Sequence, residues 1–319
     1  MKTPESVLVA GAGAIGLLVA DSLYRFDPAC VSILASGERL LRYRRGGLWV
    51  NGSRVDFALA DAETPPRTAP DIVIVACKNY HLDLLIADLK KYIGPDTVIV
   101  SLLNGIVSEE IIGAAYGKER LPLAMIVSTD AQSSNNRVTF TSRGVINFGD
   151  LRGKDAAPKE IERDQALAGF FTRADIPHKY HPDDMKQTLW YKFMVNVGAN
   201  QTSALFKLPY GVFKKGPMEI PEAKEILESA MREVIAVANA EGIALRDGDI
   251  YQWYNAMNVL NDTSYTSMCQ DIMAKRKTEV NVFSGTVIEY GKHGIPVPVN
   301  TFLNRAIKIL EKQYKQALS

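Results

Sequence analysis

Residues 7–16 are Val7-Leu8-Val9-Ala10-Gly11-Ala12-Gly13-Ala14-Ile15-Gly16. The first four form a short apolar run typical of a buried strand, and the residues from Ala14 onward have the apolar spacing of a helix. In a G-x-G-x-x-G turn between strand and helix, the first glycine permits the tight turn and the second lets a pyrophosphate approach the backbone. The third lets helix and strand pack closely, while the helix N-terminus supplies N–H groups and a partial positive charge. The segment therefore predicts a dinucleotide-binding βα unit.

Further apolar runs of strand length follow this unit, at residues 31–35, 72–76 and 97–100. Residues 81–92 lie between two of these runs and carry leucine and isoleucine at helical spacing. Apolar runs that alternate with helices are typical of a parallel sheet covered on both faces. Three later segments, 123–128, 137–141 and 144–149, look like antiparallel strands. A helix is expected to begin within 155–164, and an edge strand at 179–180.

The pattern changes after Pro182. Helical periodicity dominates from there on, with helices expected at residues 185–206, 223–241, 247–257 and 301–316. A chain of 319 residues is long enough for two domains. We therefore predict an α/β Rossmann-type dinucleotide-binding domain over residues 1–182, followed by an all-helical C-terminal domain over residues 183–319 that carries substrate-binding and catalytic groups.

Composition excludes several classes of function. The net charge of +1 argues against a nucleic-acid partner or binding to an acidic membrane. Three scattered cysteines and four histidines without paired spacing predict no metal site. The apolar stretch 7–20 is too short to span a bilayer, and nothing else resembles a targeting or anchoring segment. A cytoplasmic protein that does not contact membranes is expected.

The end of the second predicted strand bears on the choice of dinucleotide. It continues as Ala35-Ser36-Gly37-Glu38-Arg39. An NAD site usually has an acidic residue here that binds the ribose 2′-hydroxyl. Ser36 stands at the tip instead, and Arg39 and Arg42 offer guanidinium groups, which bind phosphate bidentately. NADP(H) is favoured. Two alternatives stay open: Glu38 can take the hydroxyl-binding role, or the arginines are a solvated helix surface.

A polar series interrupts the apolar helix predicted at 185–206. Lys192, Asn196 and Asn200 recur every fourth residue, which places them on one helical face. Their neighbours Trp190 and Phe193 indicate a largely buried helix. Because an unpaired buried polar group costs about 1–3 kcal/mol, the series is explained if it lines a polar cleft. The alternative is a face open to solvent.

This series suits the reduction of a carbonyl group. Hydride addition to a ketone leaves an alkoxide, and an ammonium group can stabilise that charge and supply the proton. Two carboxamides can fix the rest of the substrate. A later polar cluster contains Ser264 and Ser267, whose hydroxyls can receive a carboxylate, although by itself it looks like an ordinary charged helix surface.

With these residues in view, the chain resembles the ketopantoate reductase family (2-dehydropantoate 2-reductases), NADPH enzymes of pantothenate and coenzyme A biosynthesis. The resemblance runs nearly end to end. The matching motifs, in chain order, are Gly11-Ala12-Gly13-Ala14-Ile15-Gly16, Cys77-Lys78, Asn104-Gly105, Leu189-Trp190-Tyr191-Lys192 with Asn196 and Asn200, Ser267-Met268-Cys269-Gln270-Asp271, Thr278-Glu279, and Gly294-Ile295-Pro296-Val297-Pro298.

The resemblance implies a role for each matching position. Lys192 corresponds to the general acid, and Glu279 to a catalytic residue that also contacts the nicotinamide ribose. Asn196 and Asn200 correspond to residues that hold the hydroxyl end of the substrate, and Ser267 to one that binds its carboxylate. Cofactor contacts are expected from Gly11, Ala12, Gly13, Ala14, Ile15, Gly16, Ser36, Arg39, Lys78, Asn104 and Ala131, with Asn104 also touching substrate. These residues come from both predicted domains, so the active site is expected in a cleft between them.

Three positions depart from the family pattern. Many relatives have arginine where this chain has Ser36, and Gln201 stands where proline is common. Tyr210 replaces an asparagine that binds substrate in some members. The expected reaction is NADPH-dependent reduction of ketopantoate, a small 2-keto acid. The alternatives are reduction of another 2-oxo acid, or a non-catalytic NADP(H)-binding regulator. A homodimer is a possible assembly.

Overall fold

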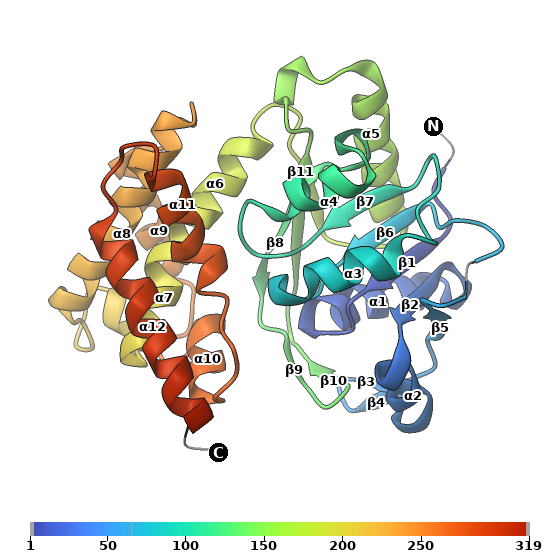
Figure 1. Ribbon diagram of the computed structural model, residues 1–319, viewed down its shortest axis with the longest axis horizontal. Coiled ribbons are helices and arrows are strands. Elements are labelled where there is room, and N and C mark those ends of the chain that lie inside the picture. Colours follow the sequence, from blue (N-terminus) through green and yellow to red (C-terminus); the bar gives the residue numbers. More distant parts are fainter. Residues whose placement is uncertain (1–2, 65, 317–319) are drawn as a thin grey trace. The chain divides into compact units, whose positions relative to one another are not determined.

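The computed structural model describes residues 3–64 and 66–316, and it divides the chain into two compact units (Figure 1). The first unit ends at Lys186 and the second begins at Gln187, a few residues after the boundary expected at Pro182. Among the described helices, none combines the length and apolar character that crossing a bilayer requires.

The first unit is built on a five-stranded parallel sheet. Its strand order is β5 (Ala58–Asp61), β2 (Val31–Ala35), β1 (Val7–Ala10), β6 (Ile72–Val75) and β7 (Val98–Ser101). The chain leaves β1 toward β2 on one side and later returns to place β6 on the other side. The strand order therefore reverses between β1 and β6, which is the switch point where open α/β sheets bind ligands.

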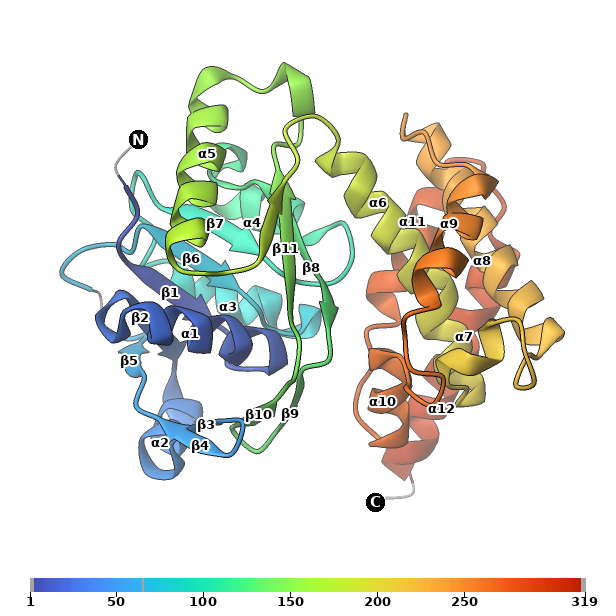
Figure 2. The same ribbon diagram turned by 180° about the vertical axis from the view of Figure 1, so that it is seen from behind.

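Helices cover both faces of this sheet, as Figures 1 and 2 show. On one face α1 (Ala14–Phe26) and α5 (Pro158–Arg173) bury Leu17 and Phe170 among alternate strand residues. On the other face α3 (Leu82–Leu89) and α4 (Ser108–Tyr116) do the same with the remaining strand side chains. The strands are apolar throughout because each is buried on both sides. The expected Rossmann-type α/β class is confirmed.

Two smaller sheets complete the unit. One pairs β8 (Leu123–Thr129) antiparallel with β11 (Arg143–Gly149), and β12 (His178–Tyr180) forms its edge, as expected. The other has the order β4 (Ser53–Val55), β3 (Leu48–Val50), β10 (Arg137–Thr139) and β9 (Gln132–Ser134). Sequence analysis missed β3, β4, β5 and β9. The expected antiparallel pairing of β10 is found with β9, while its other neighbour, β3, lies parallel to it. The short helix α2 (Gly37–Gly46) follows β2.

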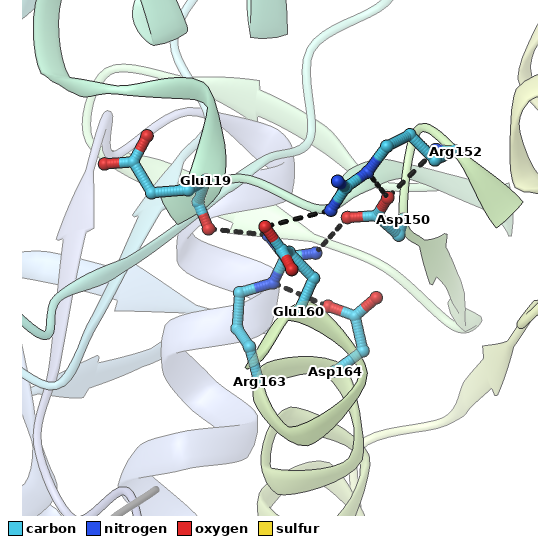
Figure 3. A network of polar contacts seen from close by, with 6 residues as sticks. All are labelled: Glu119, Asp150, Arg152, Glu160, Arg163 and Asp164. Atoms are coloured by element: carbon cyan, nitrogen blue, oxygen red, sulfur yellow. Dashed lines mark hydrogen bonds and ion pairs between the residues drawn. The ribbon is translucent and has the colours of Figure 1, made fainter. Parts of the chain in front are cut away.

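A buried ionic network anchors α5 (Figure 3). The Arg163 guanidinium donates to Asp164 at 2.7 Å, to Asp150 at 3.1 Å and to the carbonyl of Glu119 at 2.8 Å. The Arg163 side chain is only 2% exposed. Arg152, which is half exposed, extends the network to Asp150 and Glu160. A guanidinium so buried is stable only because carboxylates and a carbonyl satisfy its donors.

The second unit is helical, so the expected class is confirmed there too. Its helices are α6 (Met185–Val195), which begins at the end of the first unit, α7 (Gln201–Phe206), α8 (Pro221–Ala240), α9 (Asp247–Met257), α10 (Ser267–Met273), α11 (Thr286–Gly291) and α12 (Pro298–Gln316). The helix expected at residues 185–206 is interrupted by a π-helical turn at Asn196–Asn200, and a second π turn, Asn281–Gly285, precedes α11. Neither π turn was expected.

Candidate active site

The three glycines of the turn after β1 differ in the space around their Cα atoms. Gly11 has φ +114°, and a Cβ there would lie 2.7 Å from the backbone of Ala76 and Cys77 at the end of β6. A Cβ on Gly16 would lie 1.8 Å from the carbonyl oxygen of Gly11. A Cβ on Gly13 would meet only the Ala76 carbonyl oxygen, at an ordinary 3.8 Å. The protein's own packing therefore explains Gly11 and Gly16 and leaves free space beside Gly13.

That free space lies at the N-terminus of α1. Gly13 is the N-cap residue and supplies no side chain to cap the helix, and the first turn has no acidic residue. The amide of Leu17 donates to the Gly13 carbonyl at 3.0 Å, so the N–H groups before it have no acceptor within the helix. An open position beside uncapped amides at the switch point of the sheet fits a pyrophosphate.

Three more predicted cofactor residues lie at the same edge of the sheet. Ser36 follows the carboxyl end of β2, Lys78 follows that of β6, and Asn104 follows that of β7. The side chain of Asn79 donates to the Asn104 carbonyl at 3.0 Å, which joins the last two loops. Ala131 stands between β8 and β9 and packs against the same core cluster as Ala12 and Ile15.

The carboxylate of Asp88, on α3, lies beside the tip of β2, and sequence analysis missed it. The Ser36 hydroxyl donates to Oδ2 of Asp88 at 3.0 Å, although 52 positions separate the two residues. Arg39 is exposed, while Arg42 donates to the side chain of Asn136 at 3.1 Å. Of the two predicted arginines, Arg42 is thus engaged elsewhere. No local pattern indicates Asp88, because only the packing of α3 brings it to Ser36.

The polar series of the second unit forms a continuous row. Asn200 donates to the side-chain oxygen of Asn196 at 3.1 Å, and the Ser267 hydroxyl lies 3.5 Å from the side-chain oxygen of Asn200. Asn200 is 7% exposed, whereas Asn196 and Lys192, about one and two helical turns earlier, are half-buried. The alternative, that this helical face is fully open to solvent, is wrong for Asn200, which is buried. Ser267, from the cluster that looked like helix surface, joins the same row.

The π turn at Asn196–Asn200 sits inside this row. A π turn widens the helix by one residue and often marks a functional site. Gln201, which stands where relatives commonly have proline, donates from Nε2 to the Val197 carbonyl at 2.8 Å and to Asn300 at 3.2 Å. A proline at 201 would have no N–H to offer that carbonyl. The glutamine side chain therefore ties the π turn to α12.

Glu279 lies just before the second π turn and is 6% exposed. The preceding residue, Thr278, donates from its amide and its hydroxyl to Glu311 on α12, at 2.7 and 2.6 Å. These bonds hold the segment that carries Glu279 against α12. The second unit thus contains Lys192, Asn196, Asn200, Ser267 and Glu279, and the first contains the other predicted cofactor contacts.

Tyr210 is half-buried and lies close to the start of α10 in the chain fold. Its amide donates to the Ser264 carbonyl at 2.9 Å, three residues before Ser267. Burial raises the pKa of its phenol to about 12. The side chain is therefore a neutral hydrogen-bonding group at neutral pH.

Comparison with known proteins identifies the family. The profile described as "Ketopantoate reductase PanE/ApbA" matches residues 7–153, and the one described as "Ketopantoate reductase PanE/ApbA C terminal" matches residues 184–311. The 2-dehydropantoate 2-reductase of Aquifex aeolicus is 28% identical over 311 residues, which is 95% of this chain and 96% of that protein. The enzyme of that name from Pyrococcus horikoshii is 26% identical, over 96% of this chain and 97% of its own length.

Solved structures share the fold over nearly the whole chain. A PanE/ApbA family ketopantoate reductase from Ralstonia eutropha superposes with a TM-score of 0.79 at 21% identity, covering 97% of this chain and 99% of that one. A D-mandelate dehydrogenase solved with NADH and anilino(oxo)acetate gives 0.84 at 21% identity, with the same coverage. At such identities the likeness concerns the fold. The two profiles, which together match most of the sequence, show that the chain belongs to the ketopantoate reductase family, whose members are NADPH-using oxidoreductases.

Proposed function

We propose that this chain reduces the ketone of 2-dehydropantoate (ketopantoate) to the secondary alcohol of pantoate with NADPH, a step of pantothenate and coenzyme A biosynthesis. The observation that carries the proposal is the row of Asn196, Asn200 and Ser267 beside Lys192 on a mostly apolar helical unit. Its hydrogen-bonding groups suit a substrate that has a carboxylate, a ketone and a hydroxyl.

Lys192 is the proposed general acid. A reduced nicotinamide, when bound, would supply the hydride for the carbonyl carbon, so the protein must provide a proton for the carbonyl oxygen. The Lys192 ammonium stabilises the negative charge that develops on this oxygen and donates that proton, as the hydride enters on carbon. Its half-buried position strengthens both effects, because a charge interaction is stronger where water is partly excluded.

The remaining residues bind and orient the substrate. The amides of Asn196 and Asn200 are proposed to hold its hydroxyl end. The exposed Ser267 hydroxyl is proposed to leave its long 3.5 Å contact with Asn200 and to donate to the substrate carboxylate. Asn200 keeps a donor hydrogen beyond the one it gives to Asn196, so it can bind a ligand without breaking the row. Glu279 is proposed to contact the nicotinamide ribose and to keep the site ordered.

The dinucleotide is proposed to bind at the switch point of the first unit. The amides after Gly13 would hold the pyrophosphate, Ser36 and Arg39 would lie at the adenosine ribose, and Lys78, Asn104 and Ala131 at the nicotinamide half. The cradle beside Gly13 and the uncapped start of α1 support this placement. The proposal requires both sets of residues to act on one substrate.

The test is steady-state reduction of a panel of 2-oxo acids by the purified full chain, with NADPH and separately with NADH. The panel contains ketopantoate, pyruvate, 2-oxoisovalerate and phenylglyoxylate. We expect kcat/KM for ketopantoate to exceed that for each of the others by about tenfold or more, since buried polar groups penalise substrates that lack a partner for them. Ketopantoate among the poorest substrates would contradict the assignment. A non-catalytic NADP(H)-binding protein would bind the dinucleotide and consume none.

Tyr210 favours a second candidate, a reductase of an aromatic or bulky 2-oxo acid. This aromatic residue stands where some relatives have a substrate-binding asparagine, and its amide is fixed to Ser264 near Ser267. The same panel decides between the two: phenylglyoxylate as the best substrate, with the preference moving toward ketopantoate in Tyr210→Asn, would select the second candidate.

A further inference from the structure

We propose that Asp88 sets the dinucleotide preference of this chain, by making the subsite at the tip of β2 accept a 2′-hydroxyl, so that NADH binds about as tightly as NADPH. The inference rests on the proposed function only in taking a nicotinamide dinucleotide as the ligand of the first unit. It does not depend on the identity of the 2-oxo acid.

The hydrogen bond between Ser36 and Asp88 is the observation that carries this proposal. Ser36 is the N-cap residue of α2, yet its hydroxyl makes no bond to the helix it caps. It donates instead to Oδ2 of Asp88 at 3.0 Å, and both residues are half-buried. The tip of this strand is where the Rossmann fold places the ribose 2′ group.

The chain fold fixes the position of this carboxylate. Just beyond α3, the Tyr92 hydroxyl donates to the carbonyls of Asp61 and Thr64, at 2.8 and 3.0 Å, and the Lys91 ammonium donates to the Glu63 carbonyl at 2.9 Å. These bonds fasten the end of α3 to the segment that follows β5, the strand next to β2. They keep the backbone of this part of α3, and with it the Cα of Asp88, near the tip of β2, and the bond from Ser36 orients the carboxylate.

The charges at the tip favour a hydroxyl over a phosphate. The single proton of the Ser36 hydroxyl is already donated to Asp88, so it is not available to a phosphate oxygen. A 2′-phosphate carries about two negative charges and would meet the Asp88 carboxylate. A ribose 2′-hydroxyl, by contrast, can donate to a carboxylate. The exposed Glu38 adds a further negative charge in the first turn of α2, while the exposed Arg39 offsets it.

The test is the dissociation constant of the full chain for NADPH and for NADH, measured by nucleotide fluorescence in the absence of any 2-oxo acid. We expect the two constants of the wild-type chain to lie within about tenfold of each other. Asp88→Asn keeps the size of the side chain and removes its charge. It is expected to tighten NADPH by about tenfold and to leave NADH nearly unchanged, with the gain shrinking at high salt.

Glu38→Gln is the matched control. Glu38 is an exposed carboxylate in the first turn of α2, close to Ser36 in sequence, and no hydrogen bond joins it to Ser36. We expect this substitution to change the NADPH constant by less than about threefold. Competition by 2′,5′-ADP and 5′-AMP should reproduce the ratios, since these fragments differ only in the 2′ group. Wild-type binding of NADPH more than about a hundredfold tighter than NADH would overturn the proposal, as would an unchanged ratio in Asp88→Asn. If both dinucleotides bind as expected and no 2-oxo acid is reduced, the proposed reaction fails and this inference stands.

Discussion

Gly13 and Gly16 belong to the same motif, but the packing of the protein requires only Gly16, whereas Gly13 is proposed to leave room for the cofactor. A methyl group on Gly16 would overlap the Gly11 carbonyl, whereas one on Gly13 finds open space. We therefore expect Gly16→Ala to lower the free energy of unfolding by several kcal/mol, since the backbone must shift to relieve the overlap. Gly13→Ala should change it little and should weaken NADPH binding at least about tenfold. Urea unfolding and a binding titration check both. Equal loss of stability in the two variants would show that Gly13 is a packing residue.

Asn200 gives a second prediction at this scale. Replacing it with alanine removes the link between Asn196 and Ser267 and is expected to raise the KM for the 2-oxo acid by about tenfold, the value of one or two hydrogen bonds. The dissociation constant for NADPH should stay close to that of the wild type. Thr202→Val is the control, because that buried hydroxyl on the same stretch of helix makes no hydrogen bond. Steady-state kinetics that show no change in KM for Asn200→Ala would remove this residue from the substrate site.

At the scale of elements, sequence periodicity predicted those helices and strands whose formation depends on their own residues. Helix α9 has the expected bounds. The ends of the apolar parallel strands β1, β2, β6 and β7 lie within one residue of the ends expected for each strand. The short strands β3 and β9 were missed because three residues carry too little pattern, and their pairing depends on a partner far along the chain. The π turn at Asn196–Asn200 was missed because its support comes from Asn300, about a hundred residues later.

The ionic network around α5 allows a test with matched arginines. Arg163→Met leaves Asp150 and Asp164 buried without their guanidinium, and we expect it to lower the free energy of unfolding by about 3–5 kcal/mol. Arg152→Met removes a half-exposed partner of the same Asp150 and should cost only a small fraction of that, because water screens the pair. Denaturant unfolding of both variants gives the comparison. Similar losses for the two would contradict the network drawn in Figure 3.

Asp164 makes the stability of this network depend on pH. Burial raises the pKa of its carboxyl above the ordinary 3.8, against the opposing effect of Arg163, and its Oδ2 makes no hydrogen bond. The folded state then binds the proton more readily than the unfolded state. The contribution of Asp164 to stability is thus fully present below pH 3.8 and is lost as pH rises through the folded pKa.

Asp164→Asn keeps the acceptor for Arg163 and cannot ionise. We expect its free energy of unfolding, relative to the wild type, to increase between about pH 4 and pH 8. Urea unfolding of Asp164→Asn and of the wild-type chain, side by side across that range, is the measurement. A relative stability of Asp164→Asn that declines as pH rises would show that the pKa of Asp164 is lowered.

Over the whole molecule, the predicted site residues are divided between the two units. The glycine turn, Ser36, Lys78 and Asn104 lie in one, and Lys192 and the row of Asn196, Asn200 and Ser267 lie in the other. Both sets come from ordered sequence motifs, each of which stands beside a strand or helix, and their roles stay predictions. Asp88 and the ties of Gln201 could not be predicted, since they depend on contacts between elements distant in the chain.

The most direct test of this account compares the wild-type chain with Lys192→Ala, measuring kcat for ketopantoate and the dissociation constant for NADPH. We predict that kcat falls by about 10²–10⁴-fold, the usual contribution of a general acid, while the dissociation constant stays within about threefold. Unchanged turnover, or an equal loss of turnover and of NADPH binding, would contradict the claim that this lysine protonates the product.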